Sequence, residues 1–118
     1  MAFPVEIWLR GDNHASTEHI ESVATEPGSW TDSDVAQVLV AMLRALERAR
    51  NPAIEPDRPI ALRGFSWIVS PFEGGVLIAL ELTLGAVVGG PFSIAESRLT
   101  AMIDRVVSAE RAETGTVH

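Results

Sequence analysis

The chain has 118 residues, of which 47% are hydrophobic and 21% are charged, and its net charge is −7. This composition argues against a disordered chain, and the length predicts a single domain over residues 1–118 that can bury a hydrophobic core. Cysteine is absent, which excludes disulfides, thiolate nucleophiles and cysteine-ligated zinc. The first residues lack the basic region and the long apolar run of a signal peptide, so we expect a cytoplasmic protein.

Most of the negative charge lies in the N-terminal third. Residues 1–34 carry seven acidic side chains and one arginine, a net charge of −6, whereas the other 84 residues total −1. This field repels phosphate, so we expect no nucleic-acid partner, and it favours a basic protein surface or cations. Residues 74–95 are long enough to cross a bilayer and hold one charge, Glu81, but five glycines and Pro91 interrupt them. A central carboxylate is costly in a membrane, so we expect no membrane partner.

In the first half of the chain, apolar and polar residues alternate over residues 3–10, which predicts a half-buried strand. Turn residues follow at 11–13. Residues 17–24 could form a second strand, but few apolar residues fall on one face, so the sequence does not decide between a strand and a loop there. The next element is a helix. Thr31 is a favoured N-cap with Asp34 three residues on, and apolar positions recur at helical spacing until Asn51 and Pro52.

In the second half, residues 60–72 and 75–84 predict two strands of a hairpin. Residues 85–92, GAVVGGPF, predict a glycine-rich loop, and a second helix follows from the capping pair Ser93 and Glu96. Residues 112–118 are expected to form a frayed tail. The order β(β)αββα predicts an α+β fold with two layers, a mostly antiparallel sheet of three to four strands with two helices on one face.

The most informative feature is apolar. Ile68, Leu77 and Ala79 fall on the nominal outer face of the predicted hairpin, and Trp8 falls on that of the first strand. Two helices cover one face of a sheet, so the outer face is exposed or meets a partner, unless the sheet curls over it or the register slips by one residue. The leading hypothesis is a non-catalytic protein–protein interaction or assembly module, either a homo-oligomer or an adaptor for a basic partner.

The rival hypothesis is a small-molecule-binding protein or a small enzyme with an apolar pocket. His14, His19, Arg10 or Arg63 would anchor the ligand, and glycines would let the 85–92 loop close as a lid. These glycines are Gly85, Gly89 and Gly90. The chain has no lysine, no Gly-x-x-x-x-Gly-Lys motif and no Gly-x-Ser-x-Gly motif. The sequence therefore assigns no catalytic residue and no cofactor, and it favours a non-enzymatic protein over an enzyme without deciding between them.

A third hypothesis is a metal site at residues 12–21, formed by Asp12, His14 and His19. Histidines five positions apart do not share a helix face as those of His-Glu-x-x-His do, and no helical periodicity occurs here. A turn would have to bring the three side chains together. The alternative is a solvated polar turn.

Overall fold

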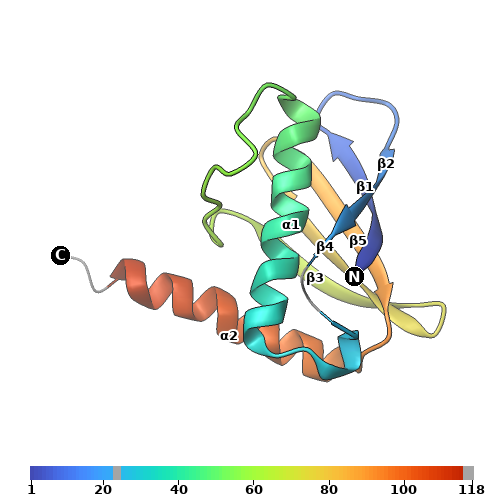
Figure 1. The fold of residues 1–118 in the computed structure, drawn as a ribbon, viewed down its shortest axis with the longest axis vertical. Coiled ribbons are helices and arrows are strands. Elements are labelled where there is room, and N and C mark those ends of the chain that lie inside the picture. The colour runs from blue at the N-terminus through green and yellow to red at the C-terminus, as the bar shows by residue number, and fades with distance from the viewer. Residues whose placement is uncertain (23–24, 116–118) are drawn as a thin grey trace.

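The computed structural model describes residues 1–22 and 25–115. Within these residues the chain forms five strands and two α-helices in the order ββαβββα, with a short 3₁₀ turn (Pro27–Ser29) before the first helix (Figure 1). The strands are β1 (Ala2–Leu9), β2 (Ser16–Glu21), β3 (Ser66–Phe72), β4 (Gly75–Leu82) and β5 (Gly85–Phe92), and the helices are α1 (Asp32–Arg50) and α2 (Glu96–Gly115).

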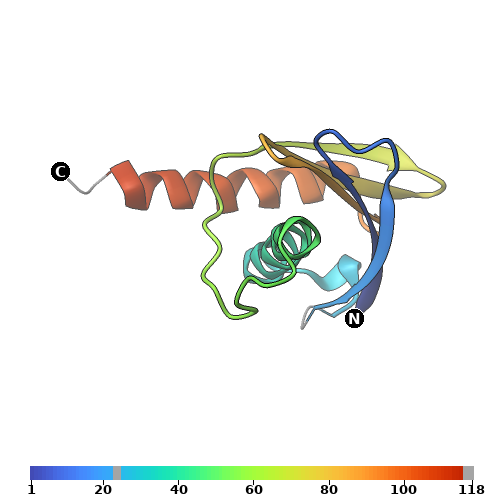
Figure 2. The same cartoon turned by 90° about the horizontal axis from the view of Figure 1, so that it is seen from above.

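The strands form one sheet in the order β2-β1-β5-β4-β3, and every neighbouring pair is antiparallel. The sheet is strongly curved. Both helices lie on its concave side, and no described element covers its convex side (Figure 2). The α+β class is thus confirmed, whereas the expected three to four strands were too few.

The additional strand is β5, so the prediction of a loop and a lid at residues 85–92 was wrong. β5 lies in the middle of the sheet and pairs with β1 on one side and β4 on the other. Its glycines allow close packing. A Cβ on Gly89 would lie 3.1 Å from Cε of Met42 in α1, and a Cβ on Gly85 would lie 2.1 Å from the carbonyl oxygen of Trp8.

The two hairpins agree more closely with the sequence. β3 and β4 are joined at Glu73 and Gly74, whose φ angles of 46° and 81° are both positive, as a type I′ turn requires. Strand β3 begins at Ser66, so residues 60–65 of the predicted strand are not in the sheet. The uncertain strand near residue 17 exists as β2 with Ile20 buried, while residues 23 and 24 lie outside the described residues.

Helix α1 begins with the predicted capping box. The Thr31 hydroxyl accepts the Asp34 backbone N–H at 3.3 Å, and the Asp34 carboxylate accepts the Thr31 backbone N–H at 2.9 Å. The helix then buries an apolar stripe against the concave face of the sheet. The buried residues of α1 are Val35, Val38, Leu39, Met42, Leu43, Ala45 and Leu46.

Helix α2 differs from the prediction at both ends. It begins at Glu96, so Ser93 lies before the helix and not at its cap. It extends to Gly115, so residues 112–115 are helical and not tail, and residues 116–118 lie outside the described residues. Among the side chains described up to residue 110, Val107 is the last buried one of α2, and the C-terminal part of the helix projects beyond the sheet (Figure 1).

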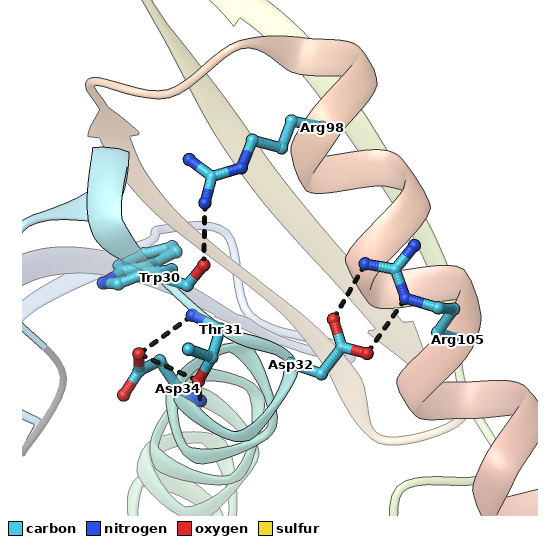
Figure 3. A network of polar contacts seen from close by, with 6 residues as sticks. All are labelled: Trp30, Thr31, Asp32, Asp34, Arg98 and Arg105. Atoms are coloured by element: carbon cyan, nitrogen blue, oxygen red, sulfur yellow. Dashed lines mark hydrogen bonds and ion pairs between the residues drawn. The ribbon is translucent and has the colours of Figure 1, made fainter.

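Polar contacts join the start of α1 to α2 (Figure 3). Arg98 donates to the carbonyl oxygens of Gly28 and Trp30, the latter at 3.0 Å. Two of the guanidinium nitrogens of Arg105, Nε and Nη2, each donate to one carboxylate oxygen of Asp32 at 2.9 Å. This bidentate hydrogen bond lowers the pKa of the Asp32 carboxyl and raises the pKa of Arg105.

Candidate functional site

The convex face of the sheet carries the four residues that the sequence predicts at an interface. Trp8 of β1 is 45% exposed and Ile68 of β3 is 61% exposed. Leu77 and Ala79 of β4 lie on the same face and are half-buried among their neighbours. The structure therefore brings the four residues to one surface.

The cross-strand register connects these residues into a continuous patch. Trp8 pairs with Ala86, Val88 pairs with Ala79, and Ala79 pairs with Ile68. The patch runs diagonally from β1 across β5 and β4 to β3. We call it the outer apolar band, and its members are Trp8, Ile68, Phe72, Leu77, Ala79, Ala86 and Val88.

The sequence missed three members of the band. Ala86 and Val88 were missed because a loop was expected over their segment, and a loop has no faces to assign. Phe72, which is 46% exposed, lies two positions after Ser70 and four after Ile68. Alternation along β3 therefore predicts the outer face for Phe72 as well. The strand signal present in this segment is the β-branched pair Val87 and Val88, a residue type that favours strands.

Two glutamates flank the outer apolar band. Glu6 pairs with Val88 on one side of it, and Glu81 pairs with Ala86 on the other. Both side chains are exposed. The band is therefore an apolar strip between two carboxylates, with no basic side chain from β1, β3, β4 or β5 on that face within the described residues.

Several acidic residues of the N-terminal third serve the fold. Glu18 accepts a hydrogen bond from Nη2 of Arg48 at 2.6 Å, which ties β2 to α1. Asp32 pairs with Arg105, and Asp34 caps α1. Arginines compensate the charges of Glu18 and Asp32 within the molecule, so these two carboxylates add less to the acidic field than composition suggests.

The structure separates the residues assigned to the rival small-molecule site. Arg10 and Gly85 lie near each other at one end of the sheet, and both line a hollow beside Trp8. Gly89 is buried in β5 under α1, and Gly90 lies near the other end of that strand. Arg63 is exposed in the connection before Gly64. A pocket closed by a glycine-rich lid is not formed, because those glycines belong to the sheet.

The candidate metal residues also lie apart. Asp12 and His14 are exposed in the connection between β1 and β2, and His19 is exposed on β2 opposite Pro4. Among the described residues, no group of three or more histidine or acidic side chains is arranged to hold a metal ion. In this structure the segment is a polar turn followed by an edge strand.

Neither the search for membrane-spanning helices nor the comparison with known proteins assigns this protein to a functional class. Within residues 1–22 and 25–115, no helix is both long and apolar enough to cross a membrane. No family model matches the sequence, and no curated protein or solved structure matched it either.

Proposed function

We propose that this protein is a non-catalytic assembly module that associates with a second copy of itself through the outer apolar band. The observation that carries the proposal is the band itself, which includes three large exposed side chains on a sheet face that no described element covers. Contiguous exposed apolar surface of this kind is typical of protein–protein contact sites. A cytoplasmic location, expected from the sequence, remains part of the proposal.

The shape of the band supports a second copy as the occupant. Trp8 and Ile68 project near its two ends, and the small residues Ala79 and Ala86 lie between them. A two-fold contact needs a surface that is complementary to itself, with projections and hollows on the same patch. Stacked sheets lie about 10 Å apart, a spacing at which large side chains of one face fill the space above small ones of the other.

Salt dependence distinguishes a second copy from a basic partner. Glu18, Asp32 and Asp34 are engaged within the molecule, so the carboxylates that a basic partner would contact at this surface are those of Glu6 and Glu81. Glu6 and Glu81 flank the band and do not interrupt it. A self-association driven by apolar contact is unchanged or strengthened by added salt, whereas a charge-driven contact is weakened.

The test is the replacement of Leu77 by Glu, measured by analytical ultracentrifugation at low and high salt. We expect the native protein to sediment as a multiple of 12.7 kDa and Leu77→Glu to sediment at 12.7 kDa with an unchanged circular dichroism spectrum. The matched control is Ala109→Glu, which adds the same charge on the exposed surface of α2. It should leave the assembly intact.

Two results contradict the proposal. One is a native protein that sediments at 12.7 kDa up to its solubility limit. The other is a Leu77→Glu variant that folds and still assembles, which would place the contact elsewhere. Should Leu77→Glu unfold, Ile68→Asp decides, because Ile68 is 61% exposed and makes few core contacts.

A further inference from the structure

A pocket of about 640 Å³ lies at the end of the sheet where β1, β4 and α1 finish. Figure 1 shows these three segments at the same end of the molecule. The backbone N–H of Arg10 donates to the carbonyl oxygen of Leu84 at 2.9 Å, which fixes the end of β1 against the β4–β5 connection. Arg50, the last residue of α1, reaches the pocket from the helix layer.

The wall of the pocket combines apolar and charged groups. Leu9, Leu82 and Leu84 line it, and all three are half-buried. Arg10, Arg50 and Asp12 also line it, and all three are exposed. The pocket therefore offers an aliphatic surface next to two guanidinium groups.

The two arginines stand out because the other described arginines are engaged. Arg48, Arg58 and Arg105 form ion pairs with Glu18, Glu47 and Asp32. Arg44 and Arg98 donate to backbone carbonyls, and Arg63 also interacts. Among the side chains described up to residue 110, Arg10 and Arg50 are the arginines that make no side-chain hydrogen bond or ion pair, and both line this pocket.

The chemistry of these groups defines a ligand class. Guanidinium groups bind carboxylates and phosphates with two parallel hydrogen bonds, and the leucines favour an apolar body. Asp12 lies in the pocket, and Glu81 lies beside Arg10 in the adjoining hollow. These carboxylates, in a protein of net charge −7, disfavour a ligand with several negative charges.

We infer that the pocket binds a small monocarboxylate with an apolar body. The carboxylate lies between Arg10 and Arg50, and the body lies against Leu9, Leu82 and Leu84. This inference does not depend on self-association, because the pocket and the outer apolar band are different surfaces.

The test is an NMR titration of the full ¹⁵N-labelled chain with hexanoate, and with hexanol as the uncharged probe of matched length. Hexanoate should shift the amides of residues 9–12, 50, 64 and 82–84, and should bind about tenfold more tightly than hexanol. Arg10→Gln or Arg50→Gln should remove that advantage. Arg58→Gln changes the net charge equally outside the pocket and should keep it.

Four results overturn the inference. They are shifts at other residues, equal binding of hexanoate and hexanol, equal losses in Arg50→Gln and Arg58→Gln, and binding of inorganic phosphate as tight as that of hexanoate. If Arg10→Gln does not fold, Arg50→Gln decides, since Arg50 is exposed at the end of α1. Sedimentation of the same samples reports separately on self-association, so failure of one proposal does not imply failure of the other.

Discussion

At the scale of a residue, Gly85 shows how closely β1 and β5 approach. A Cβ at this position would lie 2.1 Å from the Trp8 carbonyl oxygen, and the φ angle is 155°. The backbone of β1 would have to move for any side chain to fit. We therefore expect Gly85→Ala to lower the free energy of unfolding by at least about 2 kcal/mol, measured by urea denaturation.

Gly28→Ala is the control for this substitution. A Cβ on Gly28 would have no neighbour closer than a carbonyl oxygen at 3.9 Å, and the φ angle there is not in the left-handed region. The effect of this change should stay within about 0.5 kcal/mol. Equal stability of Gly85→Ala and the native protein would mean that β1 and β5 are not paired as described.

At the scale of the elements, the Asp32–Arg105 pair links the first turn of α1 to α2. Because folding lowers the pKa of Asp32, the pair stabilises the protein above the carboxyl's unfolded pKa, and this contribution is lost as the pH falls through the folded pKa. The stability difference between native protein and Asp32→Asn should therefore be largest near neutral pH and shrink below about pH 4. Urea denaturation across this pH range measures it.

Arg105→Gln is the matched variant, since it removes the other half of the same pair. Its free energy of unfolding should differ from that of the native protein with the same pH dependence as for Asp32→Asn. The double variant should be little less stable than either single variant. Added salt should reduce the difference, because both side chains are about half exposed. A difference between native protein and Asp32→Asn that stays constant down to about pH 2 would contradict this role.

At the scale of the whole molecule, self-association predicts that thermal stability depends on protein concentration. The folded assembly is favoured by mass action, so the Tm of the native protein should rise by several °C over a hundredfold increase in concentration. Ile68→Asp should abolish this dependence, measured by differential scanning calorimetry.

Thr17→Asp provides the comparison for Ile68→Asp. It adds the same charge on the same sheet face, on β2, outside the outer apolar band. Its Tm should still rise with concentration. A native Tm that is independent of concentration would contradict the assembly.

The sequence alone determined the strands and the helix start that depend on patterns within a few neighbouring residues. Alternation over residues 3–10 and 75–84 predicted β1 and β4 with the correct inner faces, although β4 ends at Leu82, and Thr31 with Asp34 predicted the start of α1. It also placed Trp8 and Ile68 on the outer face. Each of these rests on spacing within a few residues, or on side chains that bond the backbone three residues away.

Tertiary structure alone decided the place of β5 and the assembly of the pocket. Glycine favours loops when neighbours are unknown, but between β1 and β4 the absence of a Cβ at Gly85 and Gly89 is what lets strand and helix approach. Arg10 and Arg50 are 40 positions apart in the chain and line one pocket only because α1 and β1 finish at the same end of the sheet. Contacts between distant segments carry no periodic signal, so the fold itself had to reveal them.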